Sequence, residues 1–252
     1  MGWEEAVAML CALRNAVPVG VRGLPPGWTN FTPGELVEKF GTASCWHGAR
    51  RLANSLKAEP GLTALLLEIR PRGTALVGLR HRIKRIVSTC QKVHRISLEE
   101  GCGAATAADR VSDLLRYTVQ VGDVIDLVPA VEDFAEAARG ADLDIVDARH
   151  YYLDDSRYKG VHLYLADRAK LDVFEVQFHT ALEWAVLNGP NHDLYKVYRN
   201  VATPPEQAEK ALAELKRQAA SLPHPPGLAR LEAPSGSLAA CGGCARGWPT
   251  PR

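Results

Sequence analysis

A stripe of basic side chains follows a helical pattern in residues 79–95. Apolar residues recur there at the 3.6-residue spacing of a helix, at Leu79, Ile83, Ile86, Val87, Cys90 and Val93. Another face of that predicted helix carries Lys84, Ser88, Lys92 and Arg95, with Arg82 nearby. Lysine and arginine both pair strongly with phosphate oxygens, so this face is a candidate phosphate site. The stripe by itself favours the alternative of an ordinary solvated helix face.

Two carboxylates fall in segments that we predict to be strands. Asp113 lies within a strand predicted over 111–119, and Glu175 within one predicted over 173–178. Around Glu175 the side chains alternate, so that Glu175, Gln177 and His179 share one face of the strand. Such a face is more often a solvated sheet surface than an active site. Two strand carboxylates together, however, suit Mg²⁺, which uses one or two carboxylates plus substrate phosphates.

A polar, aromatic-rich loop over residues 151–162 runs into the next predicted strand. Tyr158 in this loop could stack on a nucleobase, as aromatic side chains commonly do. For a tyrosine considered alone, packing against neighbouring loop residues is the more common role.

These candidate residues need a framework of helices and strands to position them. The fold class that we predict is α+β, a mixed sheet flanked by helices. The N-terminal region is expected to be helical, and the C-terminal tail disordered. Predicted helices cover residues 7–13, 33–40 behind a capping box at Thr32, 47–57 ending before Gly61, 127–139, a segment from about 181, and one opening at 203–206. Predicted strands cover 111–119, 143–152, 160–165 and 173–178, the last two joined as a hairpin by a turn at 166–170. The domain boundaries that follow are 1–74, 75–202, 203–221 and 222–252.

The composition of the chain excludes disordered, collagen-like and fibrous proteins. The chain has 252 residues, of which 46% are hydrophobic and 23% charged, which is typical of a soluble globular protein. Its net charge of +1 gives no global argument for binding bulk nucleic acid or a membrane surface. No apolar run is long enough to span a bilayer and no basic signal region opens the chain, so we expect a cytoplasmic protein. Cys241 and Cys244 form a lone pair without further ligands, which favours a tail thiol pair with no function.

Taken in order, the candidate residues form four short motifs. They read Arg82-Ile-Lys84-x-x-x-Ser88-x-x-x-Lys92, Val111-Ser-Asp113-Leu-Leu, Tyr158-Lys-Gly-Val-His162 and Glu175-Val-Gln177-Phe-His179-Thr180. In type and order they resemble the motifs of the RelA/SpoT-like nucleotidyltransferase family, the (p)ppGpp synthetases and their toxin relatives. The resemblance covers roughly residues 75–200.

This resemblance implies a reaction and a set of site residues. It implies transfer of pyrophosphate from ATP to a ribose 3′-hydroxyl, with Mg²⁺ held by Asp113 and Glu175 as the catalytic pair. The nucleotide-binding residues that it implies are Arg82, Lys84, Ser88, Lys92, Arg95, Arg116, Tyr158, His162, Gln177 and His179. The chain departs from the family pattern at His179, where arginine is usual, and at Gly160, where serine is usual. Arg116 and Thr118 also differ from the family's usual continuation after the aspartate.

Several alternatives stay open at this point. Because the departures fall mainly on the acceptor side, the acceptor could be GDP or GTP, an adenine nucleotide, or the 3′ end of tRNA, as in toxin relatives. A nucleotide-binding module that has lost turnover is a second class, and a nucleic-acid-binding protein using the 79–95 helix is a third. Besides ATP and the acceptor, the partners considered are an antitoxin and a second copy of the chain, with no membrane partner expected.

Overall fold

The chain folds as an α+β protein, which confirms the predicted fold class. The structure is a computed structural model that describes residues 2–15, 27–167, 173–200 and 203–232. The described chain divides into two compact units. The first unit takes the described residues of Met1–Glu68, Gly78–Tyr117 and Asp172–Glu175, and the second unit takes the remainder. Five strands form one sheet in the order β1-β2-β5-β4-β3.

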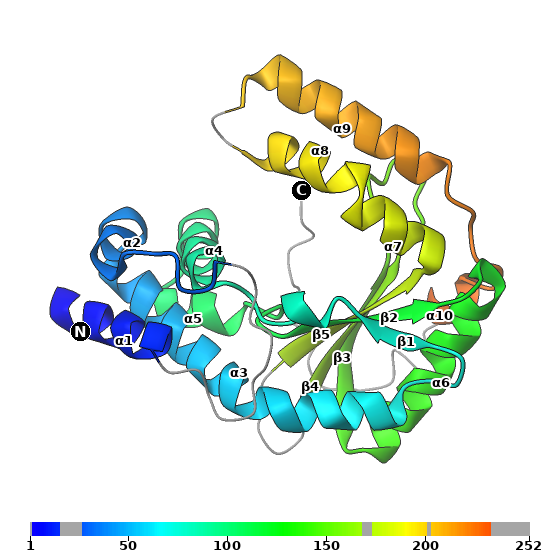
Figure 1. Ribbon diagram of the computed structural model, residues 1–252, viewed down its shortest axis with the longest axis horizontal. Coiled ribbons are helices and arrows are strands. Elements are labelled where there is room, and N and C mark those ends of the chain that lie inside the picture. The colour runs from blue at the N-terminus through cyan, green and yellow to red at the C-terminus, as the bar shows by residue number, and fades with distance from the viewer. Residues whose placement is uncertain (1, 16–26, 168–172, 201–202, 233–252) are drawn as a thin grey trace. The chain divides into compact units, whose positions relative to one another are not determined.

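The first unit is mainly helical. Its elements are α1 (Trp3–Asn15), α2 (Pro33–Phe40), α3 (Thr42–Ile69, of which the last residue belongs to the second unit), the 3-10 turn η1 (Leu79–His81), α4 (Ile86–Glu99) and α5 (Ala104–Asp109) (Figure 1). Helices α3 and α4 approach closely at Gly48, where an added Cβ would lie 3.3 Å from Thr89 Cγ2 and 3.5 Å from Val93 Cγ2. This close contact holds α4 against a buried core, and α4 carries three of the predicted nucleotide-binding residues, Ser88, Lys92 and Arg95.

Two predictions for the N-terminal helices of this unit are wrong. The helix expected to end before Gly61 continues to Ile69, because α3 keeps burying side chains on both sides of Pro60, such as Leu56 and Leu66. Packing there outweighs the tendency of proline to break a helix. The capping box expected at Thr32 does not form either, since the Thr32 side chain makes no capping hydrogen bond to α2.

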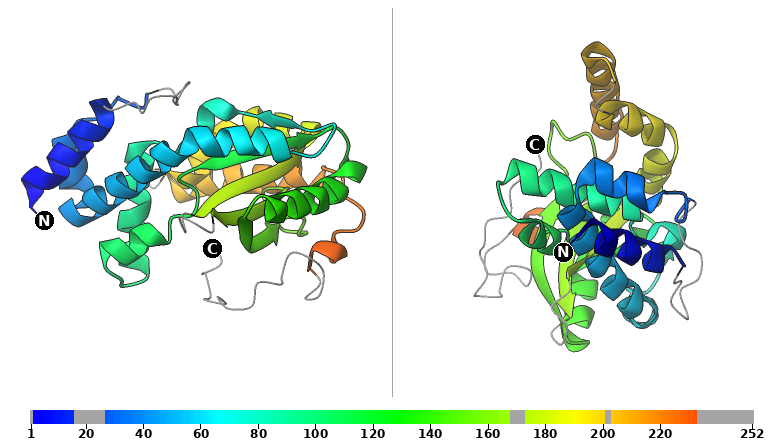
Figure 2. Two further views of the ribbon diagram at one scale, coloured as in Figure 1. Left: turned by 90° about the horizontal axis from the view of Figure 1, so that it is seen from below. Right: turned by 90° about the vertical axis from the view of Figure 1, so that its left-hand side faces the viewer.

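The second unit contains most of the sheet and the C-terminal helices. Its elements are β1 (Ala75–Val77), η2 (Val124–Asp126), α6 (Leu127–Gly140), β3 (Leu143–His150), β4 (Val161–Asp167), α7 (Ala181–Asn188), α8 (Pro190–Arg199), α9 (Pro205–Ala220) and α10 (Ala229–Glu232). Strands β2 (Arg116–Val121) and β5 (Val173–Thr180) begin in the first unit and continue into the second. Within the second unit, α9 runs alongside α8, and α6 packs on the sheet next to β3 (Figures 1 and 2).

A bulge in β3 separates apolar from polar side chains on the outer strands. Strands β3 and β4 are antiparallel, with Ile145 opposite Leu165 and Asp147 opposite Tyr164, so Val146 is an extra residue. Because an extra residue reverses the alternation of side chains, Ile145 and Asp147 lie on opposite faces although they are two residues apart. The bulge therefore gives β3 and β4 one apolar face and one polar face.

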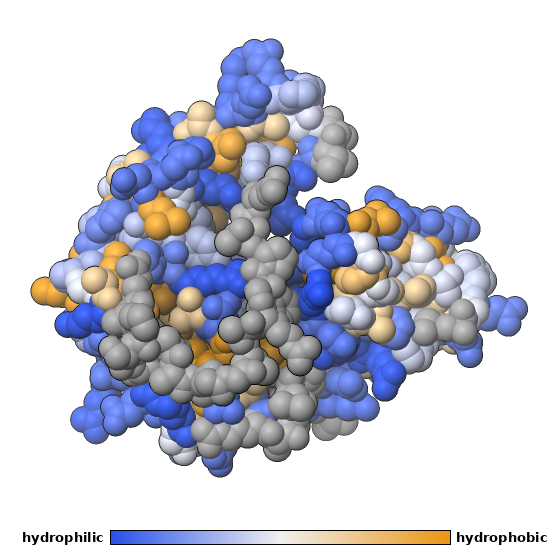
Figure 3. Space-filling view, turned by 180° about the vertical axis from the view of Figure 1, so that it is seen from behind, coloured by the Kyte–Doolittle hydropathy of each residue, from blue (hydrophilic) through white to orange (hydrophobic). Residues whose placement is uncertain are grey.

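The remaining predictions concern the chain ends, the hairpin turn and the surface. The predicted turn at 166–170 lies mostly outside the described residues, as does the predicted tail from residue 233 onward with Cys241 and Cys244. Of the tail expected from residue 222, the described part includes α10. Among the described residues, no helix is both long and apolar enough to cross a membrane. Figure 3 shows hydrophobic side chains in small groups among hydrophilic ones on the face that it presents.

Candidate functional site

A cluster of charged side chains in the first unit is assembled from three separate segments. The predicted helix over 79–95 is wrong in its first part, because α4 begins only at Ile86. Ile83, which is buried, instead forms an antiparallel bridge with Leu115, and the backbone N–H of Lys84 donates to the carbonyl of Leu114 at 2.9 Å. Pairing with another segment has overridden the helical periodicity of these residues. Lys84 therefore reaches the cluster from an extended segment and not from the helix.

Asp113 lies at the centre of this cluster. It precedes the strand that was predicted to contain it, since β2 begins only at Arg116. Its Oδ2 accepts a hydrogen bond from Lys84 Nζ at 2.7 Å, and its Oδ1 accepts one from Lys92 Nζ at 2.8 Å. The three side chains are only 16–27% exposed. Two of the predicted cations and one predicted metal ligand therefore meet directly.

Electrostatics keep the Asp113 carboxylate ionised. Burial alone would raise the pKa of Asp113, but Lys84 and Lys92 outweigh it and hold this pKa well below its usual range. Burial lowers the pKa of Lys84, an effect that Asp113 counteracts and that the nearby Lys92 and Arg116 reinforce. Because the cations outnumber the carboxylate, the cluster as a whole attracts an anionic group such as a phosphate.

The other predicted residues of the first unit differ in what they face. Ser88, Lys92 and Arg95 share one face of α4, where Arg95 is exposed and pairs with Glu99 at 2.6 Å. Arg116 is exposed at the start of β2. Arg82, in contrast, is 7% exposed, because its guanidinium pairs with the buried Glu59 and donates to the carbonyl of Leu79 at 2.7 Å.

Glu175 is the third residue of β5 and is buried, with 4% of its surface exposed. Its backbone N–H donates to the carbonyl of Leu115 at 3.0 Å, which ties β5 to the segment just after Asp113. The expectation of a solvated sheet face is therefore wrong at this position. Carboxylate oxygens such as those of Glu175 are ligands that suit a hard cation such as Mg²⁺.

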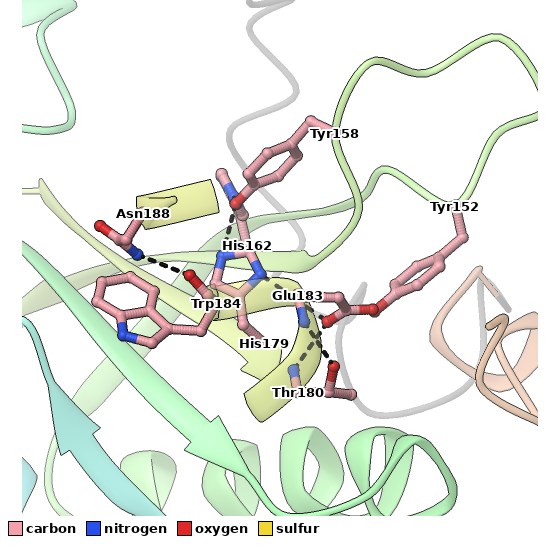
Figure 4. A network of polar contacts seen from close by, with 8 residues as sticks. All are labelled: Tyr152, Tyr158, His162, His179, Thr180, Glu183, Trp184 and Asn188. Carbon is pink, nitrogen blue, oxygen red and sulfur yellow. Dashed lines mark hydrogen bonds and ion pairs between the residues drawn. The ribbon is translucent and has the colours of Figure 1, made fainter. Parts of the chain in front are cut away.

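A second cluster lies in the second unit around Tyr158 (Figure 4). The Tyr158 hydroxyl oxygen is 2.5 Å from His162 Nε2 and 2.7 Å from His179 Nε2. His162 and His179 are 7% and 0% exposed, whereas Tyr158 is half-buried. Residues from the loop, β4 and β5 thus meet at one hydroxyl group. Gln177, the remaining predicted residue of this strand, is half-buried in β5.

Glu183 joins this cluster to the start of α7. The Tyr152 hydroxyl donates to Glu183 Oε1 at 2.6 Å, and the Thr180 backbone N–H donates to Oε2 at 2.8 Å. Thr180 Oγ1 in turn accepts from the Glu183 N–H, which completes a capping box for α7 (Figure 4). Glu183 Oε2 lies 3.9 Å from His179 Nδ1. Burial raises the pKa of Tyr152, and the adjacent carboxylate raises it further.

Two buried carboxylates were not predicted from the sequence. Glu59 pairs with Arg82, and Glu183 accepts hydrogen bonds from Tyr152 and Thr180 next to His179. Glu59 lies in the middle of a helix and carries no motif, so only the structure reveals its ion pair. Glu183 had a signal that was overlooked, because Thr180 followed three residues later by glutamate is a capping-box sequence.

A metal site made by protein groups alone is not found in the described part of the chain, where no three His, Cys, Asp or Glu side chains gather suitably. The carboxylates of Asp113 and Glu175 still fit the less demanding chemistry of Mg²⁺, which takes one or two carboxylates and completes its shell with water and phosphate oxygens.

Comparison with solved structures finds several that are similar to this chain over about two thirds of its length. The chain is similar to small alarmone synthetases. Small alarmone synthetase 1 from Bacillus subtilis matches with 20% identity and a TM-score of 0.47 over 68% of this chain and 87% of the other. A second structure of that protein, bound to its product pppGpp, matches with 19% identity and a TM-score of 0.46 over 68% and 89%.

A GTP pyrophosphokinase family protein from Streptococcus pneumoniae is also similar, with 19% identity and a TM-score of 0.43 over 67% of this chain and 83% of its own. No protein-family model matches the sequence, and no curated protein sequence is similar to it.

Proposed function

We propose that the protein is an Mg²⁺-dependent pyrophosphokinase that transfers pyrophosphate from ATP to the 3′-hydroxyl of a guanine nucleotide, GDP or GTP. The observation that carries this proposal is the pairing of Lys84 and Lys92 with Asp113. This pairing places two ammonium groups, which attract phosphate, beside a carboxylate, which suits a metal ion. The four sequence motifs support the same reaction, because each contributes side chains to one of the two clusters or to β5.

The donor side of the reaction rests on the first unit. Lys84, Lys92 and Arg116 would bind the phosphate oxygens of ATP, with Ser88 and Arg95 further along the same helix face. Asp113 and Glu175 would hold Mg²⁺, which when bound neutralises charge on the phosphates during transfer. Arg82 would contribute indirectly, since its ion pair with Glu59 steadies the segment that presents Lys84.

The chemical step is an in-line displacement at the β-phosphorus of ATP. The acceptor 3′-oxygen forms a bond to this phosphorus, the bond to the α,β-bridging oxygen breaks, and AMP leaves. The hydroxyl proton passes to a carboxylate, for which Glu175 is the candidate. No covalent intermediate with the protein is required, because positioning and electrostatic stabilisation supply most of the catalysis in phosphoryl-type transfer. On the acceptor side, Tyr158 would stack on the base.

The proposal is tested with γ-labelled ATP and Mg²⁺, offering GDP, GTP, ADP, ATP and tRNA separately. We expect label on GDP or GTP and release of AMP, and loss of both in Asp113→Asn and Glu175→Gln. The matched controls are Asp109→Asn and Glu206→Gln, which remove exposed carboxylates that pair with Arg51 and Lys210 and should leave the rate unchanged.

Each other outcome overturns part of the proposal. Label on tRNA or on an adenine nucleotide would show that the acceptor is not a guanine nucleotide and that the protein acts as a toxin relative. Binding of ATP with neither label transfer nor AMP release would indicate a nucleotide-binding module. Nucleic-acid binding that persists unchanged in Asp113→Ala, again without transfer, would favour a nucleic-acid-binding protein.

A further inference from the structure

The hydroxyl group of Tyr158 is held by two histidines from two different strands. His162 Nε2 and His179 Nε2 lie 2.5 and 2.7 Å from the hydroxyl oxygen, and both rings stand nearly perpendicular to the tyrosine ring. A tyrosine hydroxyl has one hydrogen to donate and accepts through its oxygen. Because that single hydrogen can go to only one of them, at least one histidine donates to the tyrosine oxygen.

The position of Glu183 assigns these roles. Both of its oxygens accept hydrogen bonds, from Tyr152 and from the Thr180 backbone, as carboxylate oxygens do. Oε2 lies 3.9 Å from His179 Nδ1, which is too long for a hydrogen bond, but the negative charge of the carboxylate favours the hydrogen of His179 on the nitrogen that faces it, Nδ1. His179 Nε2 then accepts the hydrogen of Tyr158, and His162 Nε2 donates to the tyrosine oxygen. The hydrogen of the Tyr158 hydroxyl is consequently directed into the protein.

Gly160 makes room for this arrangement. Its φ is +154°, and a Cβ at this position would lie 2.4 Å from His179 Cε1 and 3.2 Å from the carbonyl oxygen of Phe178. Any side chain at position 160 would overlap the imidazole. The two departures from the family pattern, glycine at 160 and histidine at 179, are therefore one steric unit, because this imidazole position requires the absence of a side chain at 160.

We propose that His179 is a positioning residue of the acceptor site. It fixes the hydroxyl of Tyr158, so that Tyr158 meets the base of the acceptor with its ring face and its hydroxyl takes no part in proton transfer. This inference rests on the proposed function for the identity of the acceptor. It goes beyond that function because it assigns to His179 the role of orienting the Tyr158 hydroxyl. Glu183 and Gly160 support this role, Glu183 by its charge and Gly160 by leaving room for the imidazole.

The test is a double-mutant cycle read by acceptor binding and by steady-state kinetics. Tyr158→Phe and His179→Leu should each raise the Kd and KM for the acceptor about threefold to tenfold, the effect of losing one hydrogen bond. Both should leave kcat and the KM for ATP within about twofold. The double variant should be no worse than either single variant, because both remove the same bond.

Three further variants complete the design. His179→Gln, whose side-chain amide can still meet the tyrosine hydroxyl, should restore most of the affinity lost in His179→Leu. Gly160→Ala should weaken acceptor binding to the same extent as His179→Leu, because the added methyl group displaces the imidazole. Tyr158→Ala should weaken the acceptor by about tenfold to a hundredfold, since it removes the stacking surface itself. Circular dichroism and thermal unfolding verify the fold of each variant. If His179→Leu does not fold, Tyr158→Phe still tests the same hydrogen bond, because it removes only the hydroxyl and keeps the ring.

Several outcomes would overturn the inference. A hundredfold fall in kcat for Tyr158→Phe would make the hydroxyl a proton-transfer group. Multiplicative effects in the double variant, or an unchanged acceptor Kd in His179→Leu, would show that His179 does not act through Tyr158. Calorimetry with GDP, GTP and ADP separates this result from failure of the proposed function. If the protein binds an acceptor without turnover, the double-mutant cycle can still be measured from the acceptor Kd values. If it binds none of these nucleotides, the inference is refuted.

Discussion

Replacing Asp113 by asparagine tests the charge cluster in the first unit most directly. In the wild-type chain the two carboxylate oxygens accept from Lys84 at 2.7 Å and from Lys92 at 2.8 Å. An asparagine offers one acceptor oxygen and turns an N–H₂ donor toward the other ammonium group. One charge-assisted hydrogen bond is lost, worth about 1.5–3 kcal/mol, and the two cations lose the charge that neutralises them.

Because the three side chains keep 16–27% of their surface in contact with solvent, the cost should stay near the lower end of the range for buried pairs. We expect the free energy of unfolding of Asp113→Asn to fall by about 2–3 kcal/mol, measured by urea denaturation with an unchanged m-value. The control is Asp109→Asn, which breaks an ion pair to Arg51 at 3.4 Å with a 71% exposed carboxylate, and should cost less than about 0.5 kcal/mol. Equal losses in the two variants would refute the electrostatic reasoning.

Three further predictions follow from the buried contacts. The pKa of Asp113 is lowered on folding, so its stabilising effect should be complete above the unfolded value of about 4 and decline as the pH falls below it. Urea titrations should accordingly show a constant gap between wild type and Asp113→Asn from pH 7 to about 5 and a narrowing gap below pH 4. Glu59→Gln should lower the free energy of unfolding by about 2–4 kcal/mol, since Arg82 loses a buried counter-ion, while the exposed Glu99→Gln should change it by less than about 0.5 kcal/mol. Thr180→Ala should cost about 1 kcal/mol through loss of the α7 cap, and a loss below about 0.3 kcal/mol would contradict the capping role.

The sequence predicted the second unit well because its strands and helix have clear periodicity. Alternating side chains located β4 and β5, and the amphipathic pattern located α6 almost to the residue. The alternation along β5 also predicted the correct faces for Phe178 and His179, which lie in this unit. Phe178 packs against Phe134 of α6 with ring centroids 5.3 Å apart, and His179 contacts Tyr158 from the other face.

The first unit was harder to predict because long-range contacts decide it. Residues 79–85 have helical periodicity, yet Ile83 pairs with Leu115, and no local pattern announces a partner 32 residues away. The motif resemblance implied that Lys84, Lys92 and Asp113 serve one site, but their direct pairing depends on a segment that was predicted in the wrong conformation. Arg82 shows the same limit, since its partner Glu59 lies in a helix without any motif.

The direct junction between β5 and α7 restricts how this region can change over evolution or by design. Thr180 ends the strand and caps the helix, so no loop residue separates the two elements. One inserted residue would turn α7 by about 100° relative to the strand, because a helix has 3.6 residues per turn. Glu183 would then leave both Thr180 and His179 at once. Length variation should therefore be tolerated at the exposed turn of Asp154 and Asp155 far better than here, and a library that diversifies the acceptor side should keep this junction at its present length.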